Sequence, residues 1–205
     1  PQYVSMVTVS TGIFLAFFAI IILYSYLLMS RVEKARWKLE EASNLDHLTG
    51  LLNRRGLYEK SGPLFRAQDL SRRSVTVLFA DLDGFTSIND TLGHPAGDKV
   101  LREVARMVSA SMRGSDIAAR FGGDEFVMVL PECPLEDAIR VAERLRQAVA
   151  EWAGRGGITL SISIGLGQAP QHGHDLDSVL ERVDSAMYRC KLSFGKGGIQ
   201  LVDAV

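Results

Sequence analysis

The chain has 205 residues, a length that suits one domain with appendages and argues against two full-sized domains. A hydrophobic fraction of 47% and a charged fraction of 23% exclude a wholly disordered chain. Because 23 Lys and Arg balance 24 Asp and Glu, the composition argues against a basic nucleic-acid-binding domain, and we expect no nucleic acid partner.

The first 30 residues contain no Asp, Glu, Lys, Arg or His. Residues 4–30 are almost wholly apolar and exceed the roughly 20 residues that a helix needs to cross a bilayer. We predict a transmembrane helix over 4–30, with the lipid bilayer as its partner. A buried core helix is a poorer explanation for so long an uncharged stretch. A signal peptide is also a poorer explanation, because no basic residue precedes the apolar stretch.

Four basic residues at positions 31, 34, 36 and 38 follow this span directly. Basic flanks stay on the cytoplasmic side of a membrane, so we expect the rest of the chain in the cytoplasm. The two cysteines, Cys133 and Cys190, agree with a reducing compartment because they are too few for a disulfide framework.

Residues 31–45 are charged and helix-favouring, and we predict a juxtamembrane helical stalk there. Val32 and Leu39 are seven residues apart, as are Ala35 and Ala42, which gives a thin heptad pattern. A dimerising stalk and an isolated solvated helix both explain two heptads.

Residues 46–205 are predicted to form one domain. In chain order, we expect a helix over 53–68 interrupted near position 62, a buried strand over 75–80, a helix over 97–112, strands over 117–120 and 125–130, a helix over 135–152, a strand over 158–166, a helix over 176–192 and an edge strand over 199–202. Because strands and helices interleave, the predicted fold is α/β, a sheet covered by helices.

Acidic residues gather where two of these strands end. Asp81 follows the buried strand, and Asp124 and Glu125 follow the two-glycine turn Gly122-Gly123. Clustered carboxylates need a compensating cation, and Mg²⁺ is commonly held by one or two carboxylates plus substrate phosphates. We therefore predict a metal–triphosphate site, which a ligand can approach closely over the two glycines. A lone Asp would instead be a turn or cap residue.

Asn89 and Asp98 flank the polar loop at 93–97. A carboxylate can accept hydrogen bonds from guanine N1–H and its amino group, while an amide pairs with O6 or N3. We therefore consider the two residues as a guanine-binding pair, although each alone would more often cap a helix.

Four collinear motifs now stand together: DHLTGLLNRR at 46–55, DLDGF at 81–85 with ND at 89–90, GH at 93–94 with GD at 97–98, and GGDEF at 122–126. In this order and spacing they resemble the diguanylate cyclase (GGDEF-domain) family, from residue 46 to about residue 202. The resemblance implies a palm-like nucleotide-cyclase sheet flanked by helices, in a protein anchored in the bacterial inner membrane by the preceding span.

The family makes cyclic di-GMP and two pyrophosphates from two GTP, so the resemblance implies a nucleotidyltransferase that uses Mg²⁺ or Mn²⁺. It assigns the metal to Asp81, the Leu82 carbonyl, Asp124 and Glu125, with Asp124 and Glu125 catalytic and Asp124 the base. It further assigns the guanine to Asn89 and Asp98, and the phosphates to Lys191 and Lys196. One domain binds one GTP, so the active unit is expected to be a homodimer.

The resemblance also assigns a product-binding, inhibitory site to Arg113 and Asp116, the ends of the motif RGSD. Arg144 is a candidate secondary contact. Arg offers a bidentate fork for phosphate or guanine, and Asp accepts from guanine N–H groups. The alternatives are a surface Arg–Asp pair and, for Arg144, a solvated helix face.

Two positions depart from the family. Thr86 stands where the family usually has a Lys that stabilises phosphate charge, and one extra residue separates Lys191 from Lys196. The alternative function is therefore a catalytically weak or silent domain that acts as a receptor for cyclic di-GMP or GTP. A cyclase that makes a monomeric cyclic nucleotide is disfavoured by Asn89 with Asp98.

Overall fold

The computed structural model describes residues 18, 20–26, 28–29, 44–66, 74–193 and 197–203. The chain divides into two compact units, Pro1–Ser43 and Asn44–Val205. In the first unit, the described residues are helical. Within the described ranges, no helix is both long enough and apolar enough to span a bilayer. Much of the predicted span at 4–30, and all but residues 44 and 45 of the predicted stalk at 31–45, lie outside the described residues.

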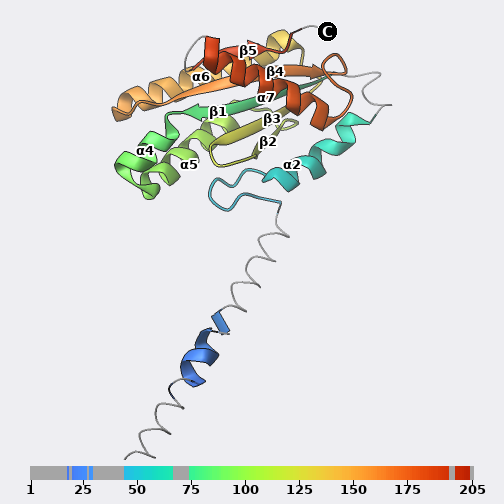
Figure 1. The fold of residues 1–205 in the computed structure, drawn as a ribbon. Helices are drawn as coiled ribbons and strands as arrows, with labels where there is room; N and C mark the ends of the chain where they lie inside the picture. The colour runs from blue at the N-terminus through green and yellow to red at the C-terminus, as the bar shows by residue number, and fades with distance from the viewer. Residues whose placement is uncertain are drawn as a thin grey trace, which may run out of the picture. The chain divides into compact units, whose positions relative to one another are not determined.

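The second unit is built on a mixed five-stranded sheet, which confirms the expected α/β architecture (Figure 1). The strand order is β2-β3-β1-β4-β5, with antiparallel pairing except between β4 and β5. The strands are β1 (Val75–Asp83), β2 (Ile117–Arg120), β3 (Glu125–Pro131), β4 (Ser161–Ala169) and β5 (Ile199–Leu201). β1 is nearly completely buried, as its continuous apolar run predicts for a central strand.

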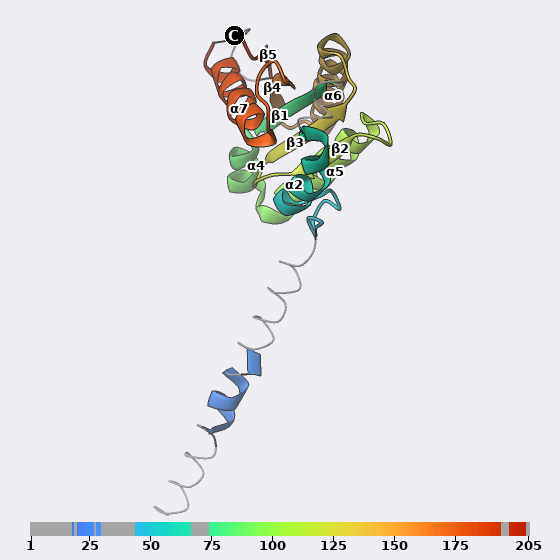
Figure 2. The same cartoon turned by 90° about the vertical axis from the view of Figure 1, so that its right-hand side faces the viewer.

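Helices cover both faces of the sheet, and Figure 2 shows α7 and α6 on opposite sides of it. α2 and α7 pack on one face; α4, α5 and α6 pack on the other. The helices are α2 (Arg54–Ser61), α4 (Phe85–Leu92), α5 (His94–Ala110), α6 (Leu135–Gly156) and α7 (Leu176–Ser193), and a 3₁₀ turn, Gly62–Phe65, follows α2 at the expected interruption.

Alternation along β1 decides which face each side chain reaches. Leu78, Ala80 and Leu82 join the core under α5 and α6, whereas Val77 and Phe79 join the core under α7. Asp81 and Asp83 continue the second series, so both carboxylates lie on the α7 face of the sheet. The same alternation therefore places the acidic end of β1 beside α7.

Several predicted boundaries are wrong. β1 continues three residues beyond the expected end at 80, and the strand expected at 158–166 lies at 161–169. The helix expected at 97–112 begins at 94, so the polar loop at 93–97 is mostly its first turn, and α4 was not predicted. α6 runs four residues past the expected end because its apolar face stays packed through Ala153.

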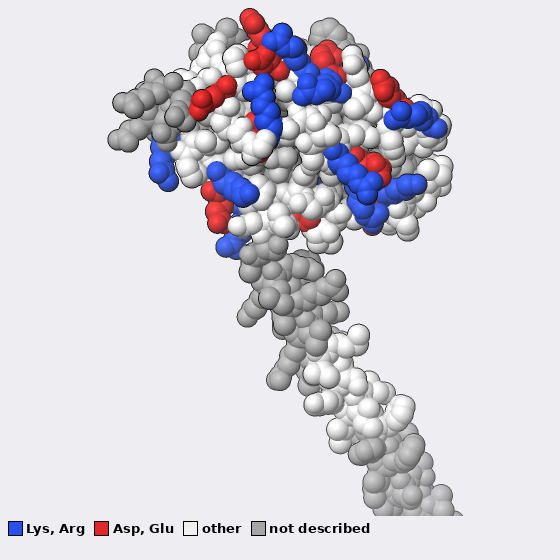
Figure 3. Space-filling model, turned by 180° about the vertical axis from the view of Figure 1, so that it is seen from behind, with Lys and Arg blue, Asp and Glu red and all other residues white. Residues whose placement is uncertain are grey.

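Charged residues are mixed over the surface. Figure 3, seen from the side opposite to Figure 1, shows Lys and Arg next to Asp and Glu, without a continuous patch of one sign on that face. This distribution matches the near-zero net charge of the chain.

Candidate active site

The end of β1 and the turn between β2 and β3 bring the predicted acidic residues together. Asp81 lies directly opposite Glu125 in the β1–β3 register. The backbone N–H of Leu82 donates to the carbonyl of Asp124 at 3.3 Å. The antiparallel pairing of the two strands therefore makes neighbours of three acidic residues that are up to 44 positions apart in the sequence.

Burial and mutual repulsion perturb these carboxyl groups. Burial raises the pKa of Glu125, and the charges of Asp81 and Asp124 raise it further. Burial likewise raises the pKa of Asp81; the Lys191 ammonium opposes this rise, and Asp124 and Asp83 add to it. Because burial and repulsion disfavour the ionised carboxylates, a bound cation would stabilise this cluster.

The two glycines of the turn differ in what surrounds them. A Cβ on Gly122 would lie 2.1 Å from Glu125 Oε2, so the space over this glycine holds the carboxylate of Glu125. A Cβ on Gly123 would meet nothing within 4 Å. The expectation that a ligand approaches over both glycines is therefore corrected: only Gly123 is open.

Lys191 reaches the same strand end from the last turn of α7. Its ammonium donates a hydrogen bond to Asp81 Oδ1 and lies 3.6 Å from Asp83 Oδ1. Burial alone would lower the pKa of Lys191, but the hydrogen bond and the charge of Asp81 raise it. Lys196, the second predicted phosphate contact, lies outside the described residues.

Asp83 lies within the motif DLDGF, but no role at the site was predicted for it. Its carboxylate is buried and accepts hydrogen bonds from the hydroxyls of Ser161 and Ser163 and from the backbone N–H of Gly197, at 2.9 to 3.1 Å. These donors connect β4 and the residues just before β5 to the end of β1. The register of β1 with β4 places Ser161 opposite Asp83 and Ser163 opposite Asp81, and this pairing explains how the serine hydroxyls reach the Asp83 carboxylate.

Arg120 supports the acidic turn by hydrogen bonds to its backbone, and no role was predicted for this residue from the sequence. Its guanidinium donates two hydrogen bonds to the Gly123 carbonyl, at 2.7 and 3.1 Å, and pairs with Asp46 at 3.2 Å. Asp46 in turn accepts from the backbone and hydroxyl of Thr49. The first of the four motifs therefore supports the last, and its position in the sequence gave no hint of that contact.

The donor set determines which metal arrangement fits. Among the described residues, no three His, Cys, Asp or Glu side chains converge closely enough to enclose a metal ion by themselves. Asp81 and Glu125, with Asp124 adjacent, nevertheless offer the hard oxygen atoms that Mg²⁺ and Mn²⁺ prefer. The residues fit a cation that completes its coordination with substrate phosphates, and they do not fit an all-protein cage.

Asn89 and Asp98 lie on the two packed helices α4 and α5. A Cβ on Gly97 would lie 2.0 Å from Asn89 Oδ1, so this glycine lets the Asn89 side chain rest against α5 next to Asp98. Asp98 does not cap α5, which begins at His94; it lies 4.0 Å from Arg102 and is about half exposed. Asn89 therefore lies against α5 at the residue before Asp98, and Asp98 is accessible.

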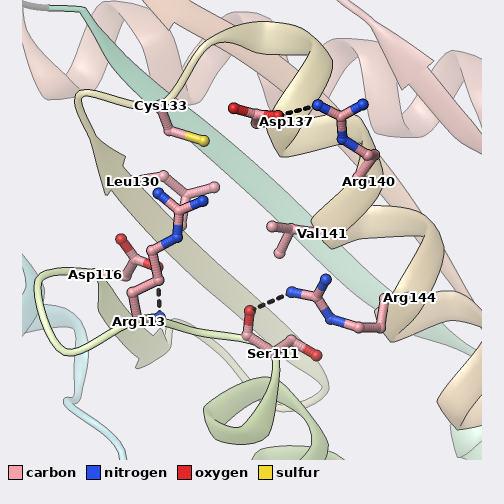
Figure 4. Close-up of a pocket in the computed structure, with 9 residues that line it drawn as sticks. All are labelled: Ser111, Arg113, Asp116, Leu130, Cys133, Asp137, Arg140, Val141 and Arg144. Atoms are coloured by element: carbon pink, nitrogen blue, oxygen red, sulfur yellow. Dashed lines mark hydrogen bonds and ion pairs between the residues drawn. The ribbon is translucent and has the colours of Figure 1, made fainter.

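A second polar hollow, of about 210 Å³, lies between the loop before β2 and α6 (Figure 4). All three predicted product-site residues, Arg113, Asp116 and Arg144, line it. Asp116 accepts from the backbone N–H of Arg113 at 2.7 Å, and Arg144 donates to the Ser111 carbonyl at 2.8 Å. No Arg113–Asp116 side-chain ion pair forms in the described part of the chain, so the Arg113 guanidinium is available to an anion.

The comparisons with known proteins agree with this architecture. Residues 43–196 match the family model described as diguanylate cyclase, GGDEF domain. The response regulator PleD of Caulobacter vibrioides is 35% identical over 178 residues, which cover 80% of this chain and 39% of PleD. The diguanylate cyclase DgcM of Escherichia coli is 41% identical over 160 residues, which cover 75% of this chain and 37% of DgcM.

Among solved structures, the GGDEF domain of DgcB from Caulobacter crescentus, in complex with cyclic di-GMP, superimposes with a TM-score of 0.66 at 27% identity. The match covers 78% of this chain and 96% of that domain. The chain spans about two fifths of the length of the curated relatives that it matches. By its family-model match and its relatives, the chain belongs to the diguanylate cyclase GGDEF-domain family.

Proposed function

We propose that the chain is a diguanylate cyclase, a nucleotidyltransferase that condenses two GTP into cyclic di-GMP and two pyrophosphates. The observation that carries this proposal is the position of Asp81 opposite Glu125, with Asp124 on the adjoining turn and Lys191 beside them. These are the groups that a metal–triphosphate site needs, and they lie in a domain whose family is named for this activity.

In the proposed reaction, the 3′-oxygen of one GTP forms a bond to the α-phosphorus of the other, and the bond to the departing pyrophosphate breaks. Asp124 accepts the proton of the 3′-hydroxyl. Asp81, the Leu82 carbonyl, Asp124 and Glu125 would hold Mg²⁺ or Mn²⁺, which would supply positive charge that stabilises the phosphates in the displacement. Lys191 and Lys196 contact the phosphates.

Asn89 and Asp98 recognise the guanine edge in this proposal. The amide and the carboxylate together present the donors and acceptors that distinguish guanine from adenine. Support comes from Gly97, whose missing side chain allows the Asn89 amide to lie against α5 one residue before Asp98.

The reaction needs two such sites, because each GTP supplies a 3′-hydroxyl to the other. A homodimer in which two domains face each other with two-fold symmetry meets this need. Association then controls turnover, since holding two reactants together supplies much of the rate. Residues 31–45 are proposed to assist this pairing as a helical stalk.

Cyclic di-GMP is proposed to inhibit the enzyme by binding between Arg113, Asp116 and Arg144. These three residues bring two guanidinium groups for phosphate or guanine and one carboxylate for guanine N–H groups to the hollow, which the ion pair of Arg140 with Asp137 also lines. DgcB binds cyclic di-GMP, which supports this ligand for the family's fold.

Residues 4–30 are proposed to anchor the chain in the bacterial inner membrane, with the domain in the cytoplasm. Large apolar side chains of the described helical part are exposed, including Ile20, Ile22 and Leu23 at 58 to 63%. So many exposed apolar side chains on one helix favour contact with lipid. Expression in a bacterium followed by fractionation tests the proposal; recovery in the soluble fraction would contradict it.

Incubation of the purified chain with GTP and Mg²⁺ or Mn²⁺ tests the activity. Cyclic di-GMP should form in the wild type and should be lost in Asp124→Ala, with Glu151→Ala, an exposed acidic residue on α6, as the control. Binding of cyclic di-GMP without any product would favour the alternative, a silent receptor, which the available Arg113 also suits. A monomeric cyclic nucleotide would refute both.

A further inference from the structure

The acidic strand end already holds a cation that belongs to the chain. The Lys191 ammonium donates to Asp81 Oδ1, the same carboxylate that the proposed function gives to the metal. The two side chains are 27% and 18% exposed, so the contact lies at the edge of the site, where water competes only in part.

Asp83 holds the ammonium from its other side. The Asp83 side chain is only 2% exposed, and its donors from Ser161, Ser163 and Gly197 fix it in place. Lys191 therefore lies between Asp81, a predicted metal ligand, and Asp83, a buried carboxylate whose oxygens already accept hydrogen bonds from three donors. The acidic Asp124 also favours a cation at this position.

We propose that Lys191 keeps divalent metal out of the Asp81 site until a nucleoside triphosphate binds. A metal ion at Asp81 would lie within a few ångströms of the ammonium and would compete with it for the same oxygen, so the two cations exclude each other. The inference rests on the proposed function, because it assigns the triphosphate as the ligand that removes the lysine.

The triphosphate can remove Lys191 because it offers a better acceptor. Lys has a flexible four-carbon stem, so its ammonium can turn from Asp81 to a phosphate oxygen without moving α7. Asp83 keeps its three neutral donors when the lysine leaves, and the incoming metal replaces the lost positive charge at Asp81. Metal and nucleotide thus enter as one complex, and metal alone binds weakly.

The test measures Mn²⁺ binding without nucleotide, by the loss of the free Mn²⁺ signal in electron paramagnetic resonance. Lys191→Met should bind Mn²⁺ about tenfold more tightly than the wild type, because a charge-assisted hydrogen bond no longer competes for Asp81. Lys191→Gln should give the same gain and guards against a folding defect in either variant. Lys60→Met, an equal charge change on α2, is the matched control and should match the wild type.

A second titration uses a non-hydrolysable GTP analogue with Mn²⁺. Here Lys191→Met should bind the Mn²⁺ complex of the GTP analogue more weakly than the wild type does. The same substitution would therefore strengthen binding of the metal alone and weaken binding of the metal with triphosphate. Equal or weaker binding of Mn²⁺ alone in both Lys191 variants would overturn the inference, as would an equal gain in Lys60→Met. Failure of the wild type to make cyclic di-GMP contradicts the proposed function separately, since the first titration contains no nucleotide.

Discussion

Replacing Arg120 with Met should loosen the acidic turn while keeping most of the side-chain volume. The change removes two hydrogen bonds to the Gly123 carbonyl and the ion pair with Asp46, in which both side chains are 15% exposed. Hydrogen bonds to charged groups contribute about 1.5–3 kcal/mol, and breaking a buried ion pair costs about 3–5 kcal/mol. Because water still reaches both side chains, we expect a loss of about 2–3 kcal/mol in the free energy of unfolding.

Urea unfolding of wild type, Arg120→Met, Asp46→Asn and the double variant measures this coupling. The double variant should lose at least about 1 kcal/mol less than the sum of the single losses, since each single change already breaks the shared pair. Turnover of GTP should fall in Arg120→Met, because Asp124 and Glu125 follow directly on the loosened carbonyl. Additive losses with full turnover would refute the bracing role of Arg120.

The same pair predicts a pH dependence. Burial would raise the pKa of Asp46, but hydrogen bonds from Thr49 and the charge of Arg120 lower it below its ordinary value. A carboxyl group whose folded pKa is lowered stabilises the fold above its unfolded pKa, about 3.9, and that contribution is lost as the pH falls through the folded pKa. The stability difference between wild type and Arg120→Met should therefore shrink below about pH 4.

Three further substitutions test the other parts of the site. Arg113→Ala should raise the cyclic di-GMP concentration that halves the rate by about tenfold, because a charge-assisted contact is lost, without abolishing turnover; unchanged inhibition would remove Arg113 from the product site. Gly97→Ala should raise the KM for GTP by about tenfold, since the new Cβ displaces the Asn89 amide 2.0 Å away; an unaltered KM would argue against guanine binding by Asn89. Thr86→Lys, at an exposed position, should raise kcat by about tenfold in a pyrophosphate-release assay. An unchanged kcat would mean that Lys191 alone supplies the positive charge that stabilises the phosphates.

Local sequence pattern predicted the strands that carry the site, because burial and alternation are local properties of a strand. The predicted ends of strands and helices were wrong where a neighbouring strand or helix determines them. Apolar residues alternate from Ile158, but β1 ends at Asp83, which pairs with Ser161, so the residues before Ser161 have no strand to join. α4 was missed because its sequence, FTSINDTL, buries only Phe85 and Ile88 and depends on packing against α5.

Asp81, Asp124 and Glu125 could be found from the sequence, but Asp83 and the partners of these carboxylates could not. Lys191 lies 110 positions from Asp81, and Arg120 lies 74 positions from Asp46. Such pairs arise from strand register and from the way that helices cover the sheet, and no local spacing encodes either. For Lys191, the resemblance supplied a phosphate contact, whereas the structure adds the carboxylate that the lysine holds without phosphate.

The carboxylates at the strand end separate into two kinds by the donors that they receive. Asp83 accepts from two hydroxyls and a backbone N–H, so its charge is compensated by the fold. Glu125 receives no such donor among the described residues, and burial together with the charges of Asp81 and Asp124 raises its pKa. The charge of Lys191 offsets only part of this rise, so the Glu125 carboxylate still destabilises the fold, and a divalent cation would relieve that cost. This asymmetry favours a protein that binds a metal ion with GTP over a silent receptor for cyclic di-GMP, because a receptor that binds its ligand only at Arg113 gains nothing from the destabilised carboxylate of Glu125.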